Sequence, residues 1–387
     1  MSPQADISVT AAGAYAALAP VPPRGWNSWN AFRCYGLTEA RVQESADVLA
    51  SSGLRDAGYE YVVVDDCWQD HQRGPDGALR SHPDRFPSGI GALAEYVHSQ
   101  GLKFGLYGCP GTKTCSMSYD GYSGVQLGSL GHETQDAETF ASWGVDYLKY
   151  DWCLADEIDG LSQPAAFARM RTELDLTGRD IVLSISEYGR WEPWSWAPEF
   201  ANLWRTTEDI SPRWESVCSI VDQQVLLAAY SRVGAWNDPD MLEVGNGELG
   251  DAAASIEVAI GRSRAHLAMW AILNAPLMLG NDLGSLQPWL LPLLTDADML
   301  AVQGDFAGTQ GRRVSQSGSI DVWAKPMTTG ELAVVVLNRG SEPASVMLSD
   351  DMTTMLHALP GLVVPSITPL AVDVPGEDAV LLRLRGR

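Results

Sequence analysis

The feature that most constrains the fold of this chain is an alternation of short apolar runs with longer amphipathic segments. It starts near Pro23 and continues to about Gly280. Short apolar runs bounded by turn residues are typical of buried strands, and apolar residues at helical spacing predict helices. Strands that alternate with helices in this way predict a parallel sheet with helices packed outside it.

Eight strand-like runs fall in this region, too many for a small open sheet. They cover Gly25–Trp29, Tyr59–Asp66, Leu102–Tyr107, Asp146–Asp151, Asp180–Glu187, Leu203–Asp209, Val233–Asp238 and Ala275–Gly280. The predicted helices between them include Ile90–Ser99, Glu133–Trp143, Ala165–Leu174, Trp214–Ser231 and Ile256–Ala271. This pattern fits a (β/α)8 (TIM) barrel, which typically takes ~250 residues. A doubly wound open sheet is the alternative, but the segment Gly25-Trp-Asn-Ser-Trp29 lacks the glycine-rich turn usual after its first strand.

The pattern changes after about Gly308, where turn residues separate short strand-like runs and no convincing helix follows. The predicted strands are Ile320–Ala324, Glu331–Asn338, Ala344–Leu348 and Ala379–Leu384. They predict a small antiparallel β-sandwich that packs on the barrel, because no low-complexity linker precedes it. We therefore expect an N-terminal extension over residues 1–22, a barrel over 23–308 and a β domain over 309–387.

The formal net charge of −23 argues against two classes of partner. Nucleic acid and anionic membrane both attract a basic face, which this chain lacks. An uncharged sugar fits better, although acidity is often only a solubility feature. No apolar stretch reaches the ~18 residues of a membrane span, and the N-terminus has no basic region typical of a signal peptide. We expect a soluble protein; the sequence leaves a cytoplasmic or secreted location, and a homo-oligomer, open.

Polar side chains gather where the predicted strands end, which in a barrel is the active-site face. They are Asp65, Asp66, Tyr107, Lys149, Asp151, Glu187, Arg205, Asp209, Asp238 and Asp240. One acid at such a point is usually a helix cap, but seven would repel one another without a functional reason. Glycoside hydrolysis requires two carboxyl groups, and sugar recognition uses further acids and cations. Lys149 lies two residues before Asp151, so both face the same side, and its charge is expected to keep Asp151 ionised.

Five motifs carry a resemblance to a known family. They are Gly25-Trp-Asn-Ser-Trp-Asn30, Val64-Asp-Asp-Cys-Trp68, Tyr147-Leu-Lys-Tyr-Asp-Trp-Cys153, Trp204-Arg-Thr-Thr-Glu-Asp209 and Trp236-Asn-Asp-Pro-Asp-Met-Leu242. Together they resemble glycoside hydrolase family 27, the family of α-galactosidases and α-N-acetylgalactosaminidases. The resemblance runs in register from about Pro23 to Gly311 and includes Lys113-Thr-Cys115 and Asn281-Asp-Leu283. The C-terminal stretch matches only as a plausible β domain.

The resemblance implies a role for each matched residue. Asp151 corresponds to the nucleophile and Asp209 to the acid/base of a retaining exo-glycosidase that uses no metal or cofactor. The implied sugar-binding residues are Trp29, Asp65, Asp66, Tyr107, Lys149, Glu187, Arg205, Asp240 and Met241. Cys34–Cys67 and Cys115–Cys153 correspond to disulfides, although reduced thiols would prevail in a reducing cytosol. Cys109 and Cys218 match no pair and are expected to be buried free thiols.

Two of these residues bear on the choice of sugar. The resemblance implies that Glu187 accepts a hydrogen bond from a 2-hydroxyl and clashes with a 2-acetamido group, which favours galactose over N-acetylgalactosamine. It also implies that the short Asp65 leaves room for a C6 hydroxymethyl group, which favours α-galactosides over β-L-arabinopyranosides. We therefore expect a small-molecule or oligosaccharide substrate with a terminal galactose.

Several alternatives stay open at this point. The Trp-rich segment Tyr188–Trp196 fits either a subsite for the leaving group or simple loop packing. Acids at barrel strand ends also hold Mg²⁺ for enolisation, with a lysine as base. A third alternative is a sugar-binding protein without activity, which would usually have lost one of the two acids, and both are present here.

Overall fold

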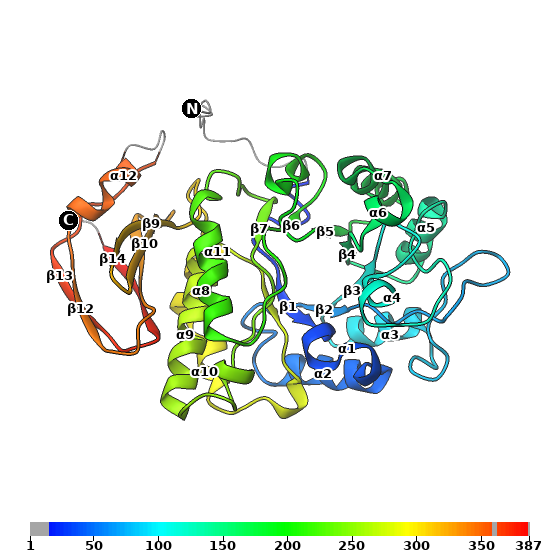
Figure 1. Ribbon diagram of the computed structural model, residues 1–387, viewed down its shortest axis with the longest axis horizontal. Coiled ribbons are helices and arrows are strands. Elements are labelled where there is room, and N and C mark those ends of the chain that lie inside the picture. Colours follow the sequence, from blue (N-terminus) through cyan, green and yellow to red (C-terminus); the bar gives the residue numbers. More distant parts are fainter. Residues whose placement is uncertain (1–14, 358–361, 386–387) are drawn as a thin grey trace.

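The structure is a computed structural model that describes residues 15–357 and 362–385 (Figure 1). An eight-stranded parallel sheet forms its centre, in the order β7-β6-β5-β4-β3-β2-β1-β8. Its strands are β1 Arg24–Asn27, β2 Tyr61–Val64, β3 Lys103–Gly108, β4 Tyr147–Asp151, β5 Val182–Ser186, β6 Leu203–Arg205, β7 Trp236–Asp238 and β8 Leu277–Leu279. Each strand therefore lies beside its neighbour in sequence, and β8 returns to β1, as the predicted barrel requires.

The barrel is closed by the chain that follows β7 rather than by β7 itself. Leu242 forms a parallel bridge with Leu279 of β8. The Leu242 N–H donates to Met278 at 2.7 Å, and the Gly280 N–H donates to the Leu242 carbonyl at 3.0 Å. This bridge holds the segment with Asp240 and Met241 against the rim of the barrel.

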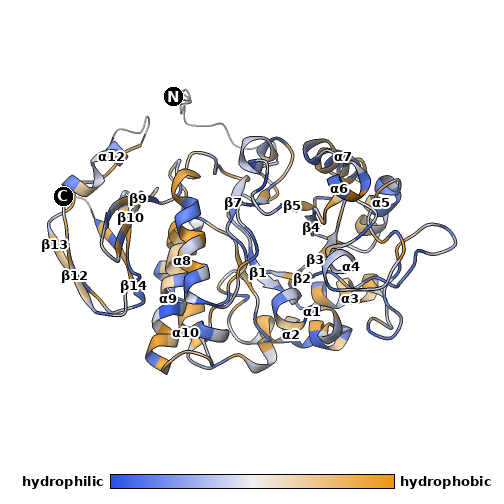
Figure 2. Ribbon diagram, viewed as in Figure 1, coloured by the Kyte–Doolittle hydropathy of each residue, from blue (hydrophilic) through white to orange (hydrophobic). Residues whose placement is uncertain are grey.

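Helices surround the sheet and bury their apolar sides on it. They are α1 Ser28–Gly36, α2 Glu39–Ser51, α3 Ile90–Ser99, α4 Cys115–Tyr119, α5 Glu133–Ser142, α6 Ala155–Asp159, α7 Gln163–Leu176, α8 Trp214–Gln223, α9 Ile256–Ile272, α10 Leu290–Leu294 and α11 Ala297–Gly304. Figure 2 shows hydrophobic and hydrophilic residues interspersed along α8, α9 and α10. All four residues of β2 are buried because the strand has the barrel interior on one face and helices on the other.

Several element boundaries differ from the predictions. The first strand ends at Asn27, whose side chain caps α1, so Trp29 lies in a helix instead of a strand. Strand β6 ends at Arg205, and the chain to Asp209 is a loop. The helix that begins at Trp214 ends at Gln223 and is followed by a short 3-10 turn, Gln224–Leu226. No bounds were predicted for α1, α2, α4, α6, α10 and α11.

The C-terminal region forms two antiparallel sheets, as predicted. One has the order β14-β11-β10-β9 and the other pairs β12 with β13. The strands are β9 Arg312–Ser317, β10 Ile320–Pro326, β11 Glu331–Asn338, β12 Ala344–Leu348, β13 Leu370–Val374 and β14 Asp378–Arg385. Strands β9 and β13 were missed, and the expectation of no helix is wrong, because α12 Thr354–His357 follows β12.

The β domain packs on the barrel through the larger sheet, beside α9 (Figure 1). Strand β11 is buried on both faces: Ala333 and Val335 join the barrel core, whereas Val334 and Val336 join the core of the β domain. Lys325 of β10 crosses this boundary and is fully buried. Its ammonium donates at 2.7 Å to Asn274 Oδ1 and to the Val302 and Asp305 carbonyls.

None of the helices in the described part of the chain is long and apolar enough to cross a membrane. Most of the predicted N-terminal extension lies outside the described residues, which begin at Tyr15.

Candidate active site

A cavity of about 310 Å³ opens at the carboxyl ends of the barrel strands. Ten of the eleven predicted catalytic and sugar-binding residues line it: Trp29, Asp65, Asp66, Tyr107, Lys149, Asp151, Arg205, Asp209, Asp240 and Met241. They come from β1 to β4, β6 and β7 and the segments that follow these strands, so the fold gathers residues that are as much as 212 positions apart, from Trp29 to Met241 (241 − 29). Its volume is at the small end of ligand pockets and suits a single sugar unit.

The backbone around this cavity is strained. Cys67, Cys153, Tyr188 and Asp240 all follow barrel strands and have φ of 72°, 54°, 64° and 89°. Side chains other than glycine rarely adopt such angles, and each such residue costs roughly 1–3 kcal/mol. These strained residues cluster at one end of the barrel, as is typical of a functional site, where a required geometry is kept at the expense of stability.

Asp65 is held by three donors at the end of β2. Its Oδ2 accepts hydrogen bonds from Asn27 Nδ2 and from Lys149 Nζ, both at 2.7 Å, and its Oδ1 accepts the Asp66 N–H at 2.8 Å. The carboxylate is 2% exposed and the Lys149 side chain 16%. Burial opposes the charge of Lys149, but Asp65, Asp151 and Asp240 together raise its pKa, so it remains a cation.

Asp151 ends β4 at the bottom of the cavity. Its Oδ1 accepts the Trp152 N–H at 2.9 Å and the Tyr188 hydroxyl at 3.0 Å. Burial raises the pKa of Asp151 to about 7, and the positive charge of Lys149 only partly offsets this effect. The expectation that the charge of Lys149 favours the ionised form of Asp151 is confirmed in direction, but burial has the larger effect.

Asp209 lies at the mouth of the same cavity, with 66% of its side chain exposed. Arg205 Nη2 is 3.2 Å from Asp209 Oδ1 and 3.1 Å from Asp240 Oδ2. Partial desolvation opposes ionisation of Asp209, but the charges of Arg205 and Lys149 outweigh it and lower its pKa. The Asp240 carboxylate also accepts the Ile210 N–H at 2.8 Å, which fixes the loop that carries Asp209.

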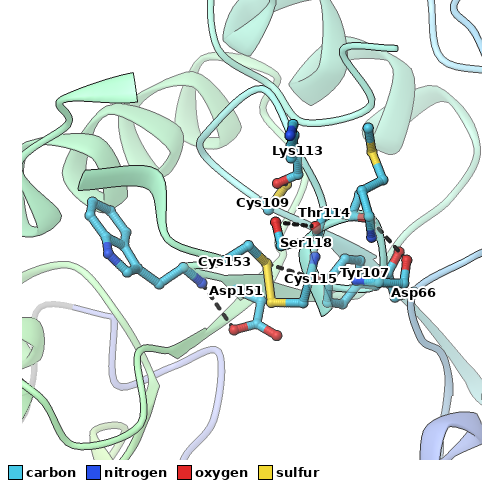
Figure 3. The surroundings of a disulfide bond; sticks show 12 residues. Asp66, Tyr107, Cys109, Lys113, Thr114, Cys115, Ser118, Asp151 and Cys153 are labelled. Atoms are coloured by element: carbon cyan, nitrogen blue, oxygen red, sulfur yellow. Dashed lines mark hydrogen bonds between the residues drawn. A yellow bond between two sulfur atoms is a disulfide. The ribbon is translucent and has the colours of Figure 1, made fainter. Parts of the chain in front are cut away.

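The predicted disulfide Cys115–Cys153 is formed, with its Cα atoms 4.5 Å apart. Figure 3 shows it beside Asp151, with Tyr107 and Asp66 on the other side. The Tyr107 hydroxyl lies 3.0 Å from Cys153 Sγ and accepts the Cys115 N–H at 3.3 Å. Next in the chain, the Ser116 N–H donates to Asp66 Oδ2 at 2.8 Å, and burial raises the pKa of Asp66 to about 6. The disulfide therefore ties the Asp66 side of the pocket to the Asp151 side.

The other cysteines also follow the expectation in part. Cys34 and Cys67 form the second disulfide, with Cα atoms 5.1 Å apart. Cys109 is a buried free thiol, as expected, whereas free Cys218 is only half-buried.

Glu187 lies apart from the other predicted sugar-binding residues. Its side chain is completely buried and is not part of the cavity wall, and burial raises its pKa to about 9. The predicted hydrogen bond between Glu187 and a 2-hydroxyl, and the preference for galactose over N-acetylgalactosamine that depends on it, therefore stay predictions. Asp238 likewise lies below the pocket, where burial raises its pKa to about 6.

The rest of the cavity wall was not predicted from the sequence; it consists of Asn30, Arg33, Cys115, Tyr119, Asp120, Tyr188, Arg190 and Glu208. Tyr188, and not Glu187, lines the cavity at the end of β5. The backbone turns at Tyr188, which has a φ of 64°. The Trp-rich segment after it is divided: Trp194 and Trp196 pack on the barrel core, whereas Trp191 is 71% exposed. Loop packing is therefore the better interpretation for most of that segment.

The comparisons with known proteins agree with this geometry. The model of a family described as alpha galactosidase A matches residues 21–305, and that of its C-terminal beta sandwich domain matches 308–369. The chain belongs to this family, glycoside hydrolase family 27. Alpha-galactosidase 2 of Arabidopsis thaliana is 44% identical over 85% of this chain and 78% of its own length.

Solved structures extend the likeness to the whole fold of this family 27 chain. Alpha-galactosidase I from Mortierella vinacea has a TM-score of 0.85 and 30% identity, covering 95% of this chain and 98% of its own. A β-L-arabinopyranosidase from Geobacillus stearothermophilus has a TM-score of 0.82 and 25% identity, covering 97% and 100%. The chain is thus a glycoside hydrolase, and the enolase-like and non-catalytic alternatives are set aside.

Proposed function

We propose that this chain is a retaining exo-α-galactosidase that releases terminal α-D-galactose through a covalent intermediate on Asp151. The observation that carries the proposal is the different depth of two carboxyl groups in one small cavity. Asp151 is 6% exposed at the bottom, and the side chain of Asp209 is 66% exposed at the mouth. A terminal sugar that enters with its anomeric carbon last would place C1 between these two carboxyl groups, with its leaving group toward solvent.

In the first step, an Asp151 oxygen bonds to C1 while the bond from C1 to the leaving oxygen breaks, and Asp209 protonates that oxygen. In the second step, Asp209 takes a proton from water, the water oxygen bonds to C1, and the electron pair of the ester bond returns to Asp151. The charge of Arg205 lowers the pKa of Asp209 and favours its ionised form. A bound sugar shields Asp209 from water, and this desolvation raises its pKa toward that of a proton donor.

The remaining polar residues suit recognition of the sugar hydroxyls. Asp65 and Lys149 form a buried ion pair that offers both acceptors and donors, and Arg205 with Asp240 forms a second. Trp29 supplies an aromatic wall and Met241 an apolar edge, which suits the alternating polar and C–H faces of a pyranose. The α-galactosidases among the relatives support galactose as that sugar.

A panel of p-nitrophenyl α-galactoside, β-L-arabinopyranoside and α-N-acetylgalactosaminide tests the substrate. We expect the α-galactoside to have the highest kcat/KM; preference for either of the others would refute the choice of galactose. Asp151→Asn is expected to be inactive, and Asp56→Asn, whose side chain is 79% exposed, is the control.

Azide distinguishes the nucleophile from the acid/base residue, because it can attack C1 from the side where a carboxylate has been removed. Asp151→Ala with azide should give the β-galactosyl azide, because azide attacks from the empty nucleophile side. Asp209→Ala should give the α-galactosyl azide, because azide attacks the intermediate on Asp151. The reverse pattern of products would exchange the two assignments.

A further inference from the structure

The loop after β5 is locked in a strained conformation at Tyr188. Tyr188 has a φ of 64°, and Gly189 follows with a φ of 75°. A Cβ on Gly189 would lie 2.2 Å from the Thr206 carbonyl oxygen, so only glycine permits this contact. Arg190 then pairs with Glu208 at 3.0 Å. Backbone strain of this kind persists where the surrounding structure enforces it, and it often occurs at functional sites. The side chain of Tyr188 is therefore a candidate for a functional role.

The strained turn brings the Tyr188 hydroxyl to the Asp151 carboxylate. The hydroxyl oxygen lies 3.0 Å from Asp151 Oδ1 and 3.1 Å from Cys115 Sγ. The sulfur is part of a disulfide and has no proton to donate, and a phenol has a single proton. A carboxylate oxygen is a much stronger acceptor than a disulfide sulfur, so the proton is directed to Asp151.

The two oxygens of the Asp151 carboxylate differ as a result. Among the described residues, the Trp152 N–H at 2.9 Å and the Tyr188 hydroxyl at 3.0 Å both donate to Oδ1. Oδ2 is left for the reacting carbon. We propose that Tyr188 is a positioning residue that holds Oδ1 so that Oδ2 attacks C1. This inference rests on the proposed function.

The hydrogen bond has unequal effects on the two steps. When the Oδ2–C1 bond forms, the carboxylate loses its charge and the bond from Tyr188 weakens. When water attacks C1, the Oδ2–C1 bond breaks and its electron pair returns to the carboxylate. The hydrogen bond then strengthens, because charged acceptors bind more tightly than neutral ones. Loss of the hydroxyl should therefore slow release of galactose from Asp151 most.

Tyr188→Phe tests this with dinitrophenyl α-galactoside, whose good leaving group makes the second step limit turnover. We expect kcat to fall about tenfold, the cost of a hydrogen bond to a charged group. KM should fall with it because the intermediate accumulates, and the acid limb of kcat/KM should move to higher pH. The control is Tyr150→Phe, since Tyr150 is another tyrosine of the barrel, fully buried, that packs against Phe167 on the helix side.

The inference is overturned if kcat and the acid limb of Tyr188→Phe match the wild type. It is also overturned if only KM rises, which would mean that Tyr188 merely shapes the pocket. If Tyr188→Phe is not recovered folded, Tyr188→Leu is measured in the same way. If neither variant folds, Tyr188 has a structural role and the inference is overturned. A wild type inactive on α-galactosides would instead refute the proposed function.

Discussion

Lys149 Nζ donates a 2.7 Å hydrogen bond to Asp65 Oδ2, just past the end of a strand two places away, rather than to Asp151 on its own strand. The cation thus neutralises one acid of the pocket directly and acts on the other through space. Lys149 lowers the pKa of Asp151 less than burial raises it, which leaves that pKa at about 7.

Replacement of Lys149 by Met should therefore damage both binding and chemistry. Loss of one partner of a buried charge pair typically costs about 2–5 kcal/mol, so we expect kcat/KM to fall by about 100-fold or more. Its acid limb should shift upward, because Asp151 loses the charge that favours ionisation. Lys103→Met is the control: Lys103 pairs with Glu60 at the surface, and both side chains are about half exposed. A pH profile of unchanged shape would contradict this account.

Asp151→Asn should stabilise the fold in a pH-dependent way. The carboxyl group has an ordinary pKa of 3.8 and a folded value of about 7. Below pH 3.8 both states are protonated and no penalty arises. As pH rises to 7, ionisation increasingly favours the unfolded chain, up to roughly 4 kcal/mol. The free energy of unfolding in urea should show the gain of the variant over wild type growing between pH 4 and 7, and a constant difference would refute the raised pKa.

Glu187→Gln should leave galactoside binding unchanged. Burial raises the pKa of Glu187 to about 9, so at pH 7 the group is neutral and glutamine closely matches its shape. We expect a KM for p-nitrophenyl α-galactoside within about twofold of the wild type, since no hydrogen bond to the sugar is lost. A tenfold rise in KM would restore Glu187 to the sugar site and contradict the geometry described above.

Much of the scaffold could be predicted from the sequence because it depends on local periodicity. Helix α3 and strand β11 follow their predicted bounds, since their apolar residues repeat with the period of the element. Closure of the barrel through Leu242 could not be predicted, because the bridge joins residues 37 positions apart (279 − 242) and has no local signal. Ten of eleven predicted site residues line the pocket because motifs at strand ends fix their position.

The exchange of Glu187 for Tyr188 shows where such prediction fails. Both residues follow β5, and alternation along a strand would normally decide which of them faces the pocket. Here Gly189 approaches Thr206 closely, and this contact between loops turns Tyr188 to a φ of 64°. The residue that reaches Asp151 is therefore set by tertiary packing and not by sequence pattern.

The junction of the β domain with the barrel should depend on Lys325. Its buried ammonium donates three hydrogen bonds, to Asn274, Val302 and Asp305. Lys325→Met leaves these acceptors unpaired, and we expect a loss of about 3 kcal/mol in the free energy of unfolding. The surface variant Lys103→Met should lose less than about 1 kcal/mol. Equal losses in the two variants would show that Lys325 does not secure the junction.

The central claim is that galactose leaves with the configuration it had in the substrate, through a covalent bond to Asp151. Proton NMR recorded during the first minutes of hydrolysis of p-nitrophenyl α-galactoside tests it most directly. We predict that α-D-galactose appears first and that the β anomer grows only as mutarotation proceeds. If β-D-galactose appears first, the reaction inverts, and Asp151 cannot be the nucleophile of a two-step mechanism.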